Sequence, residues 1–83
     1  MYSPKFGGFF MTVHFASLND VREFVSLATL QPYGVQVVDG EHSVNAKSFM
    51  EMFTLDFSNA LAVRVDSAAD EERFAQAAKK FLA

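Results

Sequence analysis

The stretch VNAKSFMEMF, residues 44–53, decides more about this chain than any other segment. A strand-like sequence runs into Lys47 and Ser48, and a short, very apolar helical turn follows at once. Serine is favoured at helix starts because its hydroxyl accepts a hydrogen bond from a backbone N–H that has no partner within the helix. The pattern therefore predicts a strand, a cap at Ser48 and a short helix.

The apolar residues of this helical turn admit two interpretations. Phe49, Met50 and Phe53 lie on one side of the turn, next to Ser48. They form a docking surface beside a modifiable hydroxyl in the first interpretation, since backbone amides and the helix dipole favour a phosphate at that position. In the second, Phe49 and Phe53 pack under the sheet and only Met50 is exposed. Spacing alone favours the second interpretation, and both stay open.

Upstream of this stretch, the sequence predicts a strand and a helix. Apolar and polar residues alternate from Met11 to Ala16, which is the period of a half-buried strand. Ser17 then caps a helix, with Asp20 three residues later as in a capping box. The helix should end before Pro32, because proline has no backbone N–H to donate and restricts the residue before it. Helical spacing predicts a buried stripe of Leu18, Val21, Phe24, Val25 and Ala28.

The remaining alternating segments predict three more strands. Tyr33–Val37 and His42–Ala46 flank the pair Asp39-Gly40, which indicates a hairpin turn. After a polar connection over residues 56–60, Leu61–Val65 alternates as the last strand.

A final helix is predicted after Ser67. Acidic residues occupy its first turn and lysines lie near its end, an arrangement that suits the helix dipole. Its buried stripe is predicted to be Phe74, Ala77, Ala78 and Phe81. The element order is β-α-β-β-α-β-α, which predicts an α+β fold: an open-faced β-sandwich, with a four-stranded antiparallel sheet covered on one face by three helices.

The first ten residues read as a separate leader. Pro4, Gly7 and Gly8 interrupt any regular pattern. We expect residues 1–10 to be poorly ordered, or to extend the first strand through Phe9 and Phe10, and residues 11–83 to form the domain.

Residues 45–50, Asn-Ala-Lys-Ser-Phe-Met, resemble the signature Asn-Ala-Lys-Ser-Ile-Met of HPr, the small phosphocarrier family of the bacterial sugar phosphotransferase system. The resemblance covers about residues 11–83, with residues 24–28 fitting the family's first helix and residues 61–65 its last strand. It implies the same open-faced sandwich. In that family a dedicated HPr kinase/phosphorylase phosphorylates the serine of this motif, and by resemblance this regulatory role falls on Ser48.

The chain departs from the family at the carrier site. HPr carries phosphate on a histidine at the start of its first helix, followed by Ala-Arg-Pro. Counting back from Ser48 without gaps places Ser17 there, and Asn19 stands where the arginine would steady the phosphate. A phosphoserine ester has a much lower transfer potential than a phosphohistidine, so we expect no competence as a histidine phosphocarrier. Glu51 also replaces a small residue of the family and adds negative charge near Ser48.

Composition narrows the functional class. The chain has 83 residues, which is enough for one small core, and it has no cysteine, which suits a reducing cytoplasm. Its net charge of −3 gives no electrostatic basis for binding nucleic acid directly, and no apolar run reaches the length of a membrane span. His14 and His42 have no cysteine or close carboxylate with which to form a metal site. We expect no enzyme, no metal and no cofactor.

Three functional hypotheses follow. The first is an HPr-like regulatory protein that docks partners through Lys47, Phe49, Met50 and Phe53 and is controlled at Ser48 in carbon catabolite regulation. By resemblance, its partners are HPr kinase/phosphorylase, a transcription regulator or phosphotransferase-system proteins. The second is a divergent phosphocarrier modified at His14 by enzyme I, which requires that histidine to lie at a helix start rather than within a strand. The third is a structural interaction protein, either a monomer or a weak homodimer through the open sheet face or the leader.

Overall fold

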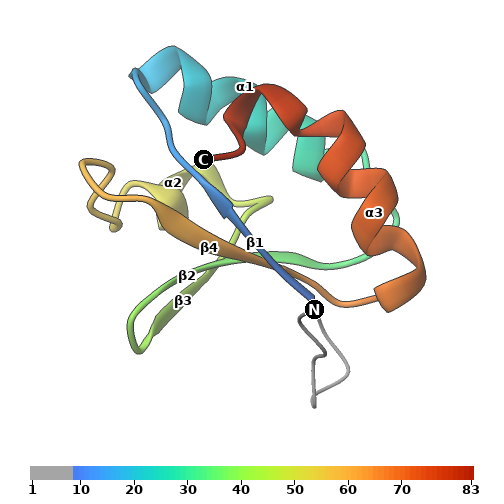
Figure 1. Cartoon of the computed structure of the whole chain (residues 1–83). Helices are drawn as coiled ribbons and strands as arrows, with labels where there is room; N and C mark the ends of the chain where they lie inside the picture. The colour runs from blue at the N-terminus through green and yellow to red at the C-terminus, as the bar shows by residue number, and fades with distance from the viewer. Residues whose placement is uncertain (1–8) are drawn as a thin grey trace.

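Four antiparallel strands form one sheet, in the order β1-β4-β2-β3, in the computed structural model, which describes residues 9–83 (Figure 1). The strands are β1 (Phe9–Val13), β2 (Val35–Asp39), β3 (His42–Asn45) and β4 (Leu61–Val65). The helices are α1 (Leu18–Thr29), α2 (Phe49–Met52) and α3 (Ala68–Ala77), and the 3₁₀ helix η1 (Lys79–Phe81) follows α3. The predicted element order and open-faced sandwich are confirmed for these residues.

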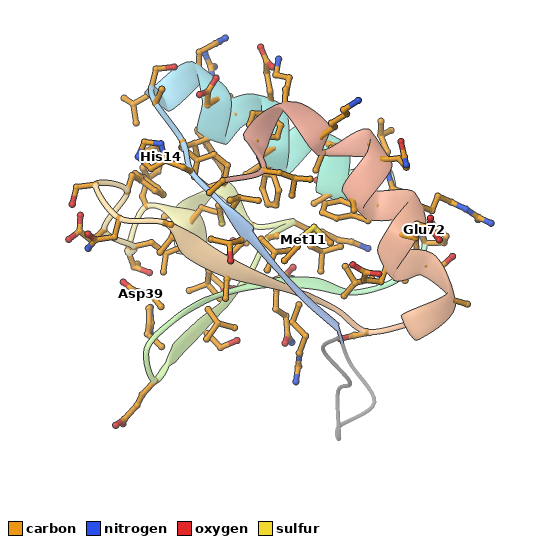
Figure 2. The ribbon with its side chains drawn as sticks, in the orientation of Figure 1. Met11, His14, Asp39 and Glu72 are labelled. Atoms are coloured by element: carbon orange, nitrogen blue, oxygen red, sulfur yellow. The ribbon has the colours of Figure 1, made fainter. Side chains whose placement is uncertain are left out.

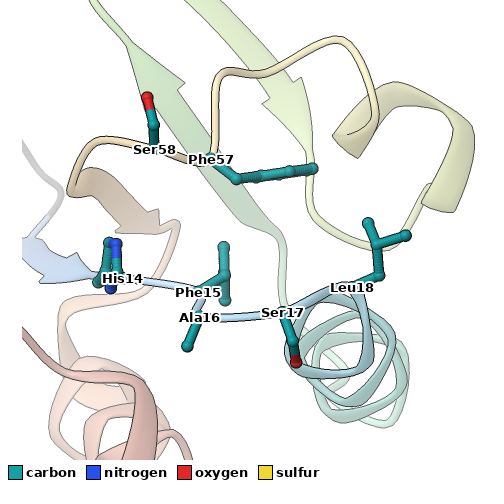
Figure 3. A pocket seen from close by; sticks show the side chains of 7 residues that line it. All are labelled: His14, Phe15, Ala16, Ser17, Leu18, Phe57 and Ser58. Carbon is teal, nitrogen blue, oxygen red and sulfur yellow. The ribbon is translucent and has the colours of Figure 1, made fainter.

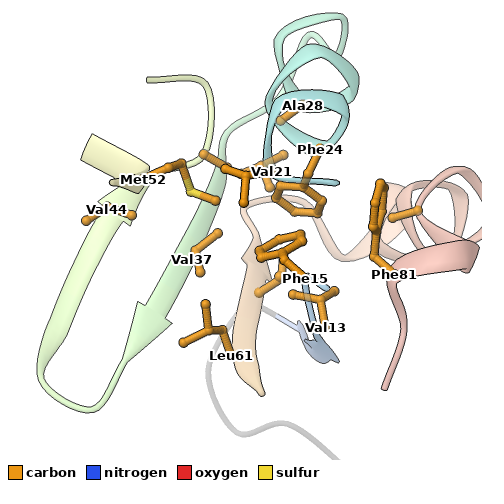
Figure 4. Packing of buried hydrophobic residues seen from close by; sticks show 14 of the residues in the cluster. Val13, Phe15, Val21, Phe24, Ala28, Val37, Val44, Met52, Leu61 and Phe81 are labelled. Carbon is orange, nitrogen blue, oxygen red and sulfur yellow. The ribbon is translucent and has the colours of Figure 1, made fainter. Parts of the chain in front are cut away.

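The core lies between one face of the sheet and the helices (Figure 4). Val13, Val37 and Val63 point into it from three different strands and are fully buried. Phe24 of α1 packs edge-to-face against Phe15, Phe74 and Phe81. Alternation along the strands therefore builds one wall of the core, and aromatic side chains from the helices fill the space above it.

Helix α1 begins and ends where the sequence predicts. The Ser17 hydroxyl accepts a hydrogen bond from the backbone N–H of Asp20 at 3.3 Å. The Asp20 carboxylate accepts from the N–H of Ala16 at 2.9 Å, so the predicted capping box is present with its return bond one residue upstream. The prediction that Leu18 belongs to the buried stripe of this helix is wrong, because Leu18 is 60% exposed. It is the first helical residue and lies before the part of α1 that packs on the core.

The first strand is displaced from its predicted bounds. It starts at Phe9, so Phe9 and Phe10 extend it as expected, and the sheet begins two residues before the predicted domain boundary. The rest of the predicted leader, residues 1–8, lies outside the described residues. The strand ends at Val13, which pairs with Leu61, the first residue of β4, so that β4 offers no partner beyond it. His14 therefore follows the strand, and its predicted place within a strand is wrong.

The hairpin between β2 and β3 turns one residue later than predicted. Asp39 pairs with His42, which leaves Gly40 and Glu41 as the two loop residues. Gly40 has φ of +63°, a left-handed conformation that suits glycine at the first position of a two-residue hairpin loop.

Two details of the last helix also differ from the prediction. Ser67 holds the cap position of α3 but makes no side-chain capping hydrogen bond. Ala77 is exposed rather than buried, because α3 ends there and the tighter η1 turn brings Phe81 back into the core. The hydrogen bond from Lys80 to Glu23 ties η1 to α1 and raises the pKa of the Lys80 ammonium above its ordinary value.

Backbone groups on both outer strands of the sheet have partners beyond the sheet. At the end of β1, the N–H of Ala83 donates to the Thr12 carbonyl, and just beyond the strand the N–H of His14 donates to the Phe81 carbonyl, each at 2.9 Å. On β3, the N–H of Asn45 donates to the Glu51 carboxylate at 2.9 Å. No helix within residues 9–83 is long and apolar enough to cross a membrane.

Candidate functional site

The turn that carries Ser48 is fixed by hydrogen bonds from both sides. Ala46 is buried, and its N–H donates to the Val35 carbonyl at 2.9 Å. The Asn45 side chain accepts from the N–H of Lys47 at 2.9 Å, and the Asn45 carbonyl accepts from the N–H of Ser48 at 3.0 Å. Asparagine suits this position because its short side chain closes a turn on the backbone two residues ahead.

Ser48 caps α2, as the sequence predicts. The Ser48 hydroxyl accepts from the backbone N–H of Glu51 at 3.3 Å. The Glu51 carboxylate reaches back across the turn to the N–H of Asn45. This hydrogen bond holds the Glu51 carboxylate at the start of the helix, on the same turn as Ser48, where the sequence predicts its negative charge.

Lys47 takes part in the fold through its ammonium group. Its Nζ donates to the carbonyl of Gln31 at 2.8 Å, just beyond the end of α1. A cation at this end of a helix is favourable because unpaired carbonyls and the helix dipole both attract it. The residue predicted to bind partners thus joins the Ser48 turn to α1, and a contact between Lys47 and a partner stays a prediction.

The apolar residues of α2 divide between the core and the solvent. Met50 is 82% exposed and Phe53 is 47% exposed, whereas Met52 is fully buried. Phe49 is half-buried against the core, with its ring 4.5 Å from that of Phe53 between centroids. The interpretation that buries both rings and exposes only Met50 is therefore wrong for Phe53. We call Phe49, Met50 and Phe53 the α2 surface.

Two residues that the sequence analysis did not select extend this region towards α1. Phe57 packs edge-to-face against Phe53 at 6.4 Å and against the buried Phe15 at 6.0 Å, between ring centroids. Leu18, at the start of α1, lines the same pocket as Phe57. Phe57 is the only aromatic residue in the polar connection over residues 56–60, and this contrast could have marked it in the sequence as a residue of the site.

That pocket lies at the start of α1, beside Ser17, the residue that the resemblance to HPr predicts at the carrier position (Figure 3). It has a volume of about 330 Å³ and is lined by His14, Phe15, Ala16, Ser17, Leu18, Phe57 and Ser58. Among the described residues, this lining contains no lysine or arginine. Ser17 caps α1, and the amide of Asn19 donates to Glu23 at 3.0 Å along the helix, although Asn19 does not line the pocket.

The two histidines occupy different environments. His14 is exposed and lies near the start of α1, away from the labelled carboxylates Asp39 and Glu72 (Figure 2). His42 is exposed at the start of β3, with Nε2 2.9 Å from the hydroxyl of Thr54. That hydroxyl donates to the Glu51 carbonyl, so the His42 ring must donate to it. Among residues 9–83, no group of three or more His, Cys, Asp or Glu side chains is placed to hold a metal ion.

Comparison with known proteins gives no match to a family model, to a curated protein or to a solved structure. The resemblance to HPr therefore stays a prediction that rests on residues 45–50 and on the order of the elements.

Proposed function

We propose that this protein is an HPr-like regulatory protein of the bacterial cytoplasm that docks partner proteins through the α2 surface. It does not relay phosphate through a histidine, and it is controlled by phosphorylation of Ser48 in carbon catabolite regulation. Its partners are HPr kinase/phosphorylase and a transcription regulator or phosphotransferase-system proteins. The motif over residues 45–50, the element order and Ser17 at the carrier position support this proposal.

One observation carries the proposal: Met50 and Phe53 are exposed next to Ser48. Large apolar side chains grouped at a surface favour contact with another protein, because burying each one in an interface contributes about 1.5–3 kcal/mol. Met52, two residues from Met50, is fully buried. Helix α2 therefore has a core side and a separate exposed side.

The charges around Ser48 define the partner that fits. A phosphate on Ser48 adds about −1.5 to −2 charge. It would lie on the same turn as the Glu51 carboxylate, and the Lys47 ammonium is bonded to Gln31. We expect the partner to supply a compensating cation, and an arginine is best suited because its guanidinium binds phosphate through two hydrogen bonds. We infer that the partner presents an arginine beside an apolar pocket.

Treatment with HPr kinase/phosphorylase and ATP should place an acid-stable phosphate on Ser48. The label should disappear in Ser48→Ala and persist in Ser17→Ala. Ser17 is a matched control, because each serine caps a helix by accepting from the N–H three residues ahead at 3.3 Å. Each substitution should cost about 0.5–2 kcal/mol of stability, so circular dichroism should verify that both variants are folded. An unlabelled native chain, under conditions that modify an ordinary HPr, would contradict control by this kinase.

A divergent phosphocarrier is the second candidate, and the position of His14 favours it. This exposed histidine lines the pocket at the start of α1 together with Ser17. Phosphoenolpyruvate and enzyme I would then give an acid-labile label that is lost in His14→Gln and kept in His42→Gln. Our main proposal predicts no such label, because the described lining of the pocket holds no lysine or arginine to stabilise a phosphohistidine.

A further inference from the structure

We propose that Met50 is a site of reversible oxidation, at which a peroxide converts the α2 surface from apolar to polar. The oxidation of Met50 is argued from its exposure to solvent, and only the consequence for partner docking rests on the proposed function. The chain contains four methionines and no cysteine, so the sulfur atoms that an oxidant can attack are all methionine thioethers.

The described methionines differ sharply in access to solvent. Met50 is 82% exposed, Met52 is fully buried, and Met11 is partly buried against the core. Met1 lies outside the described residues. Oxidation of a thioether requires direct approach of the oxidant to sulfur, so a small peroxide reaches Met50 in the folded protein and reaches Met52 only after the core opens.

The reaction is an oxygen transfer. A lone pair on the Met50 sulfur attacks one oxygen of hydrogen peroxide, the S–O bond forms, the O–O bond breaks, and the other oxygen leaves as water after proton transfer. Sulfur loses two electrons and the peroxide gains them. Methionine sulfoxide reductase, with a dithiol as electron donor, returns the thioether and releases water while the dithiol becomes a disulfide.

Oxidation at this position leaves the fold intact. Helix α2 is held by Ser48, by the Glu51 carboxylate and by the buried Met52 side chain, and none of these depends on the Met50 side chain. A sulfoxide on Met50 therefore adds a strong dipole to the α2 surface without entering the core. A sulfoxide on Met52 would bury a polar oxygen among apolar side chains, which is costly when it has no hydrogen-bond partner.

Hydrogen peroxide titration of the full folded chain, followed by peptide mapping, tests the order of oxidation. Met50 should react at least about tenfold faster than Met52 and Met11, and unfolding in guanidinium should make the three rates similar. The peptide that contains Met1 is separated in the map and does not enter the comparison. Equal rates for Met50 and Met52 in the folded protein would overturn the proposal.

Hydrophobic interaction chromatography tests the change in the surface. Retention should fall after peroxide treatment and recover with both epimer-specific methionine sulfoxide reductases and dithiothreitol. Met50→Leu should keep its retention through the same treatment, and this variant also controls for oxidation at Met1. Unchanged retention of the native chain with Met50 fully oxidised would refute the switch. Neither readout depends on Ser48, so failure of the kinase experiment leaves this result standing, and the reverse also holds.

Discussion

Phe24→Ala should lower the free energy of unfolding by about 3–5 kcal/mol, the usual cost of replacing a buried phenylalanine by alanine. The Phe24 side chain is fully buried, and its ring lies 5.1 Å from that of Phe15 and 5.7 Å from those of Phe74 and Phe81, between centroids. Its loss removes three edge-to-face contacts and leaves a cavity where α1, α3 and η1 meet. Urea unfolding followed by circular dichroism measures the change.

This effect is large for a small domain, whose total stability is about 5–15 kcal/mol. Leu30→Ala is a suitable control, because Leu30 is 80% exposed just after α1 and its truncation should stay within about 0.5 kcal/mol. A loss below about 1 kcal/mol for Phe24→Ala would mean that the core repacks around the missing ring, and that the aromatic contacts do not determine the position of α1.

Met52→Ala should lower the free energy of unfolding by about 2–5 kcal/mol, whereas Met50→Ala should change it by no more than about 0.5 kcal/mol. The two methionines lie two residues apart on α2, and they are fully buried and 82% exposed, respectively. The same substitution at both positions isolates burial from residue type and helix propensity. Urea unfolding of both variants, under identical conditions, gives the comparison.

The outcome bears on the candidate site as well as on stability. Equal losses for the two variants would mean that α2 is rotated relative to the arrangement described above, so that Met50 also contacts the core. The α2 surface and the oxidation site at Met50 would then both be wrong. A large difference between the variants supports both.

The strands and the two longer helices were predictable because each repeats a clear period, whereas the short α2 was predicted from its serine cap. Leu61–Val65 alternates in sequence, and its side chains alternate between the core and the other face of the sheet. The errors fall at the ends of elements. Leu18 and Ala77 fit a helical stripe in sequence, but each is at the end of a helix and is exposed. The end of β1 is set by pairing with β4, which a single segment does not reveal.

The candidate site was predictable only where its contacts join residues that are close in sequence. The Ser48 cap follows from local sequence, since it joins residues three positions apart. The bond from Lys47 to Gln31 joins residues 16 positions apart and depends on how the Ser48 turn packs on α1. The pocket between Phe57 and Leu18 likewise forms only when the start of α1 meets the connection over residues 56–60.

The hydrogen bond between Glu51 and Asn45 has a consequence for the behaviour of the chain in crowded solution. Asn45 is the last residue of an outer strand, and an unpaired N–H there would be a template on which a foreign strand could grow. The carboxylate occupies that donor, and the C-terminal residues occupy Thr12 and His14 along the opposite border. The acidic side chain beside Ser48 thus occupies a backbone donor at the end of β3 that a foreign strand could otherwise use.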